Sequence, residues 1–184
     1  MLDTIGHHTV EDKDNADYIE NNSPFRIANI DQAYLGSGYY FWDNHINLAH
    51  WWGDMRYDGQ YVICEGKFTV PSELFFDLVG DREAQISLEA LISEFNLENE
   101  PLGQVFEFLK KLEKRPDMKG IFPYKVIRAA DQGVNSYEQK QMKFASKRKG
   151  VMSLTPMYII CLIEKNQLHL HSYKIVYPDH YVQD

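Results

Sequence analysis

The chain has 184 residues, of which 44% are hydrophobic and 25% charged, a composition typical of a folded domain rather than of a disordered or fibrous protein. Its net charge of −8 argues against a protein that holds nucleic acid by bulk electrostatics, because phosphate binding needs a basic surface. No apolar run approaches the roughly 18 residues of a membrane span, and the acidic first residues lack the apolar core of a signal peptide. We therefore expect one cytoplasmic domain over 1–184, without membrane contact.

The first third of the chain predicts strands and short helices around a glycine-rich turn. Residues 4–10 are typical of a strand, and the acidic segment 11–22 is typical of a helix. The stretch 35–53, LGSGYYFWDNHINLAHWWG, contains two glycines one residue apart and a strand-like aromatic run. Asp43 then predicts the N-cap of a short helix. Residues 59–70 alternate between apolar and polar side chains and predict another strand.

The middle of the chain predicts a pair of helices between two strand-rich parts. Residues 82–95 and 101–114 each carry apolar side chains at helical spacing, so we expect an inserted helical hairpin at about 82–114. Strands resume over three later segments: 124–130, 157–165 and 168–177. This order of elements predicts an α+β fold.

A long polar connection, 131–155, separates the first two of these later strands. Connections of that length in a compact domain are usually functional or mobile. It holds a cluster of basic residues in an otherwise acidic chain: Lys140, Lys143, Lys147, Arg148 and Lys149. Such a cluster suits an acidic protein or a nucleic-acid phosphate, and a solvated surface loop is the alternative interpretation.

Several side chains of the first third suit a pocket for a planar ring attached to a ribose. The segment 7–9, His-His-Thr, offers imidazole and hydroxyl groups for ribose hydroxyls or an amide. The turn at 36–38 allows backbone to come close to a ligand, because glycine has no Cβ. Flat faces that can enclose a ring come from four residues: Tyr39, Tyr40, Trp51 and Trp52. Each feature alone is more often structural, and their order and spacing carry the interpretation.

In these residues the sequence resembles the ADP-ribosyltransferase superfamily, in the diphtheria-toxin and poly(ADP-ribose)-polymerase branch that uses a His-Tyr-Glu triad. It is also similar to small bacterial ADP-ribosyltransferase-like proteins. The family's His-Gly-Ser/Thr motif matches His7-His8-Thr9, with His8 in place of the glycine. Its Gly-x-Gly-x-Tyr-Phe motif matches 36–41, followed by Asp43 and a helix that carries Trp51. Two late strand motifs of the family correspond to 125–131 and 158–165.

The resemblance implies a split, two-sheet β core with flanking helices and NAD, as substrate, in the cleft between the halves. It implies that His7 binds the nicotinamide-side ribose and that Thr9 helps to hold the ribose or the carboxamide. Tyr40 would stack on the nicotinamide and Trp51 would close its other face, while Tyr39 or Phe41 and Trp52 anchor the core. The full set expected to bind NAD is His7, His8, Thr9, Gly36, Gly38, Tyr39, Tyr40, Trp51 and Tyr158.

The chain departs from the family at the third position of the triad. Active members have a Glu at the start of the late strand, where it stabilises the positive charge that develops as nicotinamide leaves. Here that position falls on Met157 or Tyr158. We therefore expect single transfers rather than polymer elongation. Glu138, in the preceding connection, would join His7 and Tyr40 as the catalytic acid, and Glu164 is a second option.

The function that the resemblance implies is an NAD-dependent mono-ADP-ribosyltransferase or NAD glycohydrolase, such as a bacterial toxin or defence effector. Its acceptor would be a protein or a nucleic acid, and its partner an antitoxin or immunity protein. Two alternatives stay open. The first is an inactive module of the same fold that binds NAD, ADP-ribose or a partner chain. The second is a metal site at the pair His7 and His8 or at His169 and His171, but no neighbouring Asp or Cys completes a ligand set, and we expect no metal.

Overall fold

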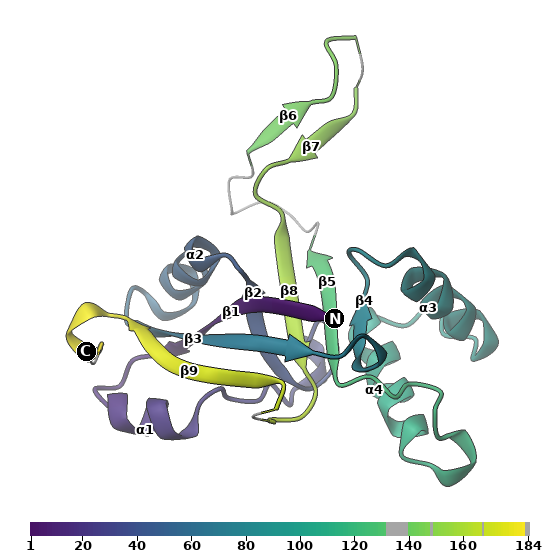
Figure 1. The fold of residues 1–184 in the computed structure, drawn as a ribbon, viewed down its shortest axis with the longest axis horizontal. Helices are drawn as coiled ribbons and strands as arrows, with labels where there is room; N and C mark the ends of the chain where they lie inside the picture. The colour runs from purple at the N-terminus through teal and green to yellow at the C-terminus, as the bar shows by residue number, and fades with distance from the viewer. Residues whose placement is uncertain (132–139, 148, 167, 183–184) are drawn as a thin grey trace.

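The centre of the fold is a β-sheet with helices around it (Figure 1). In the computed structural model, which describes residues 1–131, 140–147, 149–166 and 168–182, seven strands form this sheet. Their order across it is β4 (Phe75–Asp77), β5 (Val126–Asp131), β8 (Met157–Leu162), β2 (Tyr39–Asp43), β1 (Leu2–Glu11), β3 (Tyr61–Val70) and β9 (Leu170–Tyr177). All neighbours are antiparallel except β4 and β5, which confirms the expected α+β class.

The predicted helical hairpin is confirmed as α3 (Arg82–Glu94) and α4 (Leu102–Glu113). The helix α3 begins after Asp81, whose carboxylate accepts hydrogen bonds from the first-turn backbone N–H groups. The apolar faces of both helices pack on the β4 and β5 end of the sheet, around a cluster that includes Phe76, Leu88, Val105, Phe106, Leu109 and Ile127. Figure 1 shows the pair beside that edge, whereas α1 (Ala16–Asn22) and α2 (Ile46–Tyr57) lie near the opposite half.

The expected start of α2 is wrong by two residues. Asp43 is the last residue of β2, and α2 begins after His45, whose side chain makes no capping hydrogen bond. The buried Asp43 carboxylate instead accepts a hydrogen bond from Thr4 Oγ1 at 2.6 Å and lies 3.3 Å from Nη1 of Arg128. These contacts link β1, β2 and β5. They also stabilise the carboxylate, since a buried charge needs hydrogen-bond or ion-pair partners.

The two halves of the sheet meet at a short junction between β1 and β2. Along its other edge β1 pairs with β3 over its full length, from Leu2 to Glu11. With β2 it forms only the pairs Gly6↔Asp43 and His7↔Trp42. Beyond His7 the two strands part. The strands thus form one continuous sheet rather than two separate ones, and this sheet is nearly divided at the junction.

A second, small sheet projects from the body of the molecule (Figure 1). It is a ribbon of two antiparallel strands, β6 (Gln141–Lys143) and β7 (Val151–Ser153), within the predicted polar connection. It rises where β5 ends and β8 begins. In the part of the chain that the structure describes, none of the helices has the length and apolar character that a membrane span requires.

Candidate functional site

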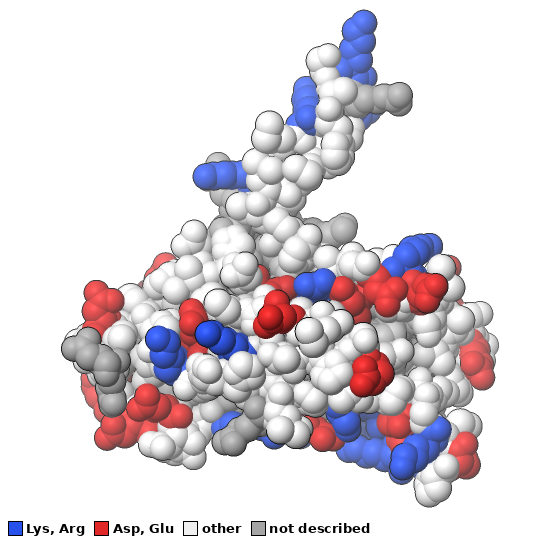
Figure 2. Space-filling view, viewed as in Figure 1, with Lys and Arg blue, Asp and Glu red and all other residues white. Residues whose placement is uncertain are grey.

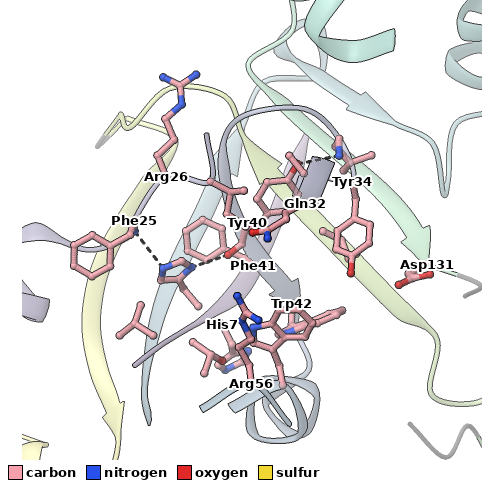
Figure 3. Close-up of a pocket in the computed structure, with 18 of the residues that line it drawn as sticks. His7, Phe25, Arg26, Gln32, Tyr34, Tyr40, Phe41, Trp42, Arg56 and Asp131 are labelled. Carbon is pink, nitrogen blue, oxygen red and sulfur yellow. Dashed lines mark hydrogen bonds between the residues drawn. The ribbon is translucent and has the colours of Figure 1, made fainter. Parts of the chain in front are cut away.

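A cleft of about 1140 Å³ opens where β1 and β2 part (Figure 3). One wall is β1 at 7–11, whose edge is unpaired beyond His7, and the opposite wall is loop 31–35 with the start of α4. Residues 40–42 of β2 and the ends of β5 and β8 form its floor. Since ligand pockets of about 300–1,000 Å³ enclose drug-sized molecules, a cleft of this size has room for a dinucleotide.

His7 is the cleft residue with the clearest capacity to bind a ligand. It is 5% exposed, and its Nε2 lies 3.4 Å from the Glu65 carboxylate on β3. Its Nδ1 is buried and has no hydrogen-bond partner among the described residues. Burial lowers the pKa of His7, and the opposing effect of Glu65 only partly offsets this. A neutral ring with its proton toward Glu65 leaves Nδ1 as a hydrogen-bond acceptor without a partner.

His8 has a structural position instead. Its Nδ1 lies 2.8 Å from the Tyr40 carbonyl oxygen, and its Nε2 accepts a hydrogen bond from the Phe25 backbone N–H at 3.2 Å (Figure 3). Burial lowers the pKa of His8 to about 4, so the ring is neutral with its proton on Nδ1. The imidazole thus bridges strands where backbone pairing has stopped, and no ring nitrogen is left for the NAD contact that we expected.

Thr9 and Tyr40 also use their polar atoms within the protein. Thr9 Oγ1 donates to the Ala49 carbonyl at 2.9 Å and fastens α2 to β1. The Tyr40 hydroxyl donates to the Gly36 carbonyl and accepts from the Leu35 N–H at 2.9 Å, and burial raises its pKa well above the ordinary value. Both residues line the cleft, so the part of Tyr40 that is open to a ligand is its ring.

The two glycines of the turn are required by protein packing rather than by a ligand. Gly36 has φ of +78°, and a Cβ there would lie 2.8 Å from the side chains of Glu107 and Lys110. A Cβ on Gly38 would lie 2.5 Å from Sγ of Cys161 on β8. Neither glycine is among the residues that line the cleft, so the expected close approach of this backbone to NAD stays a prediction.

The inserted helix α4 fixes the loop wall of the cleft. Oε1 of Glu107 accepts from the N–H of Ser37 at 2.5 Å and from its hydroxyl at 2.7 Å. Lys110, 9% exposed, donates to the carbonyls of Leu35 and Ser37 at 3.1 and 2.9 Å and lies 3.3 Å from Glu107. Burial alone would raise the pKa of Glu107, but the Ser37 hydrogen bonds and Lys110 lower it. We call Glu107 and Lys110, with their bonds to the backbone of 35–37, the clamp. It gives the inserted helices a role that the sequence did not reveal.

The aromatic surface of the cleft differs from the expected one. Trp42 and Trp52 line it, and Trp51 does not. The ring of Trp51 packs against that of Trp42, with centroids 6.3 Å apart. The ring of Trp52 lies at the same distance, 6.3 Å, from that of Trp42, and it lines the cleft as well. Phe41 is 2% exposed, which confirms its core position, and Tyr39 packs beside the same core cluster.

The acid nearest the position of the absent Glu comes from the neighbouring strand. Met157 is directly opposite Asp131 in the β5 and β8 ladder, and Asp131 lines the cleft (Figure 3). Tyr158 faces a second hollow, with Arg128 and Thr155, because successive strand residues alternate between faces. Glu164 follows the far end of β8 and lies 3.5 Å from Lys125. The other expected acid, Glu138, lies outside the described residues.

Cationic side chains add to this cleft, and the alternative metal sites do not gain support. Lys13, Arg26 and Arg56 line it, and such charges favour a diphosphate. Nε2 of His171 lies 3.0 Å from Thr69 Oγ1. The described residues contain no group of three or more His, Cys, Asp or Glu side chains that could hold a metal ion.

The cleft therefore brings an unpartnered imidazole nitrogen, aromatic rings, cations and the carboxylates of Glu11, Asp31 and Asp131 into a single hollow. These groups can bind hydroxyls, a planar ring, a diphosphate and a developing positive charge, respectively. Comparison of the chain with protein-family models, curated proteins and solved structures found no match.

Proposed function

We propose that the chain is an NAD-dependent mono-ADP-ribosyltransferase that cleaves the bond between ribose and nicotinamide in this cleft. The observation that carries the proposal is the buried, unpartnered Nδ1 of His7 in the cleft wall. The histidine that the family's first motif assigns to ribose binding corresponds to this same residue. A ribose hydroxyl that donates to Nδ1 would remove the cost of an unsatisfied buried group, about 1–3 kcal/mol.

The remaining contacts of NAD follow from the cleft lining. The nicotinamide ring would lie against the aromatic floor, with Tyr40 and Trp52 as its stacking partners. The diphosphate would lie toward Arg56, since the Arg26 guanidinium donates to Ser37 Oγ at 2.9 Å. His8 and Thr9 hold the wall in shape without contacting the substrate through their hydrogen-bonding atoms.

Asp131 is the group that we assign to transition-state stabilisation. When the glycosidic bond breaks, its electron pair leaves with nicotinamide, which becomes neutral, and positive charge develops on the ribose. A carboxylate in the cleft stabilises that charge. A nucleophile of the acceptor then bonds to the anomeric carbon and releases its proton. This chemistry transfers one ADP-ribose unit and agrees with the expectation of single transfers.

The test is nicotinamide release from NAD by the purified chain, measured chromatographically. Asp131→Asn should slow release about 100-fold or more, since removal of one such electrostatic group costs 10²–10³ in rate. His7→Ala should lower NAD turnover by a similar factor. The matched controls are Glu164→Gln, an acid at the far end of β8, and His171→Ala, and both should remain within about twofold of the parent. Turnover that is unaffected by the Asp131 and His7 changes would overturn the proposal.

One observation favours a second function, an inactive module that binds NAD or ADP-ribose. It is the buried Met157, 4% exposed, at the position of the family's Glu. Calorimetry decides between the two. Binding of NAD that His7→Ala abolishes, with no nicotinamide release over hours, would establish the module and exclude the transferase.

A further inference from the structure

The β6 and β7 ribbon has one apolar face that the described residues leave exposed. Met142 pairs with Met152, the Phe144 N–H donates to the Gly150 carbonyl at 3.2 Å, and the Leu154 N–H donates to the Lys140 carbonyl at 2.7 Å. Because residues two apart in a strand share a face, the four apolar side chains lie together. Their exposed fractions are 58% for Met142, 70% for Phe144, 46% for Met152 and 48% for Leu154.

The same ribbon is strongly basic. Residues 140–155 contain four lysines, one arginine and no acidic residue, whereas the whole chain has a net charge of −8. Figure 2 shows blue and no red side chains along the ribbon, whereas the face of the body in that view carries red side chains together with some blue ones. Lys147 and Lys149 lie in the turn, at the end farthest from the body. A polyanion would therefore be attracted to the ribbon, while the net negative charge of the chain opposes its binding elsewhere.

We propose that this ribbon binds single-stranded nucleic acid. Its lysines would contact phosphates, and its apolar face, led by Phe144, would pack against unpaired bases. Positive charge combined with an exposed aromatic side chain is the arrangement that binds single strands with little sequence preference. In a duplex the base faces are hidden in the stack, so the apolar face would have no partner there.

Two other occupants fit this surface less well. A ribbon that inserts into a membrane needs its apolar side chains at the tip, but here the tip carries Lys147 and Lys149. Protein interfaces are depleted in lysine, whereas lysine is a principal phosphate contact in nucleic-acid interfaces. A ribbon with four lysines in 140–155 thus fits a nucleic acid better than an acidic protein.

The ribbon also lies close to the candidate active site. It rises from the end of β5, where Asp131 lines the cleft. A strand bound to the ribbon would pass near the cleft mouth. Such a strand could also be the ADP-ribose acceptor, and this part of the inference rests on the proposed function. Binding of the strand to the ribbon does not depend on it.

The test is fluorescence anisotropy with end-labelled single strands of mixed sequence, DNA and RNA, and with the matching duplexes, using the full chain without NAD. The ribbon variant is the triple change Lys143→Ala, Lys147→Ala and Lys149→Ala. The control variant removes the same charge from the body through three exposed lysines: Lys111→Ala, Lys114→Ala and Lys119→Ala. Circular dichroism checks that both variants fold.

We expect single-strand binding that weakens about tenfold or more in the ribbon variant and by less than about twofold in the control. The slope of log affinity against log salt should fall by about 2, since each phosphate contact on a single strand contributes about 0.7. Phe144→Ala should weaken binding at least fivefold, about 1 kcal/mol or more of lost base stacking, and leave the salt slope unchanged.

Absence of single-strand binding at low salt, equal loss in both triple variants, or tighter binding of the duplex would each overturn the proposal. Ribbon-dependent flotation with vesicles of phosphatidylcholine and phosphatidylserine, without single-strand binding, would assign the surface to membranes instead. Single-strand binding by a chain that never releases nicotinamide would leave this proposal standing and remove the transferase.

Discussion

The β1 wall of the cleft owes its shape to backbone pairing, whereas the opposite wall, loop 31–35, owes its shape to side chains of α4. On the first wall, β1 pairs with β3 along its whole length, so its other edge can stay unpaired and still be rigid. On the second wall the chain forms only a short 3₁₀ turn (Ile30–Gln32). The adjoining segment is held by Glu107 and Lys110. The two walls are thus held in place by different means.

This difference teaches how a cleft can open within a sheet without leaving buried backbone groups unsatisfied. Where β1 and β2 part, the His8 ring forms hydrogen bonds with the Tyr40 carbonyl and the Phe25 N–H. It thus supplies these two backbone groups with a side-chain partner in place of a strand partner. In the loop, the carbonyls of Leu35 and Ser37 are satisfied by Lys110. His7 Nδ1 has no such partner among the described residues, and neither does Asn15 Oδ1, which also belongs to a residue that lines the cleft.

The largest effect should come from breaking the loop wall. We expect Glu107→Ala to lower the free energy of unfolding by about 4 kcal/mol, because it leaves the buried Lys110 ammonium without its carboxylate. Urea denaturation measures this change. In the same background Lys110→Met should restore part of the loss, since it removes the unpaired charge. The control Glu98→Ala, at an exposed position, should cost less than about 0.5 kcal/mol. A loss below about 1 kcal/mol for Glu107→Ala would show that the clamp is not needed.

The β1 wall should be sensitive to pH through His8. Its pKa is lowered to about 4 in the folded state by burial, against about 6.5 when unfolded. Between these two pH values His8 binds a proton in the unfolded chain but not in the folded chain. The free energy of unfolding therefore falls as the pH falls from about 6.5 to about 4. The full effect of this group is about 3 kcal/mol. We expect His8→Asn to be less stable at neutral pH but to lose correspondingly less on acidification, and urea denaturation across pH checks this. Parallel curves for the parent and the variant would contradict a neutral, buried His8.

Local periodicity was sufficient to predict most elements of the fold, including the strand over 59–70 and the helical hairpin at 82–114. It was insufficient wherever a residue's role depends on a partner far along the chain. The glycines at 36 and 38 were recognised, but their neighbours on α4 and β8 are remote in sequence. Asp131 was not among the expected acids, because its place opposite Met157 depends on strand register, which hydrophobic alternation does not specify across a long connection.

The same reason explains why Trp52 lines the cleft, although Trp51 was expected to do so. Both lie on α2, and only its packing against the sheet decides which one turns toward the cleft. If the proposed function holds, Trp52→Ala should weaken NAD binding about tenfold, the effect of losing roughly 1.4 kcal/mol of aromatic contact. Trp51→Ala should change NAD affinity by less than about twofold while lowering stability, because its ring packs on Trp42. Calorimetric titration with NAD, paired with urea denaturation of each variant, separates the two effects. The opposite order would mean that Trp51 turns to the ligand on binding, and that α2 repacks while the two walls hold the cleft.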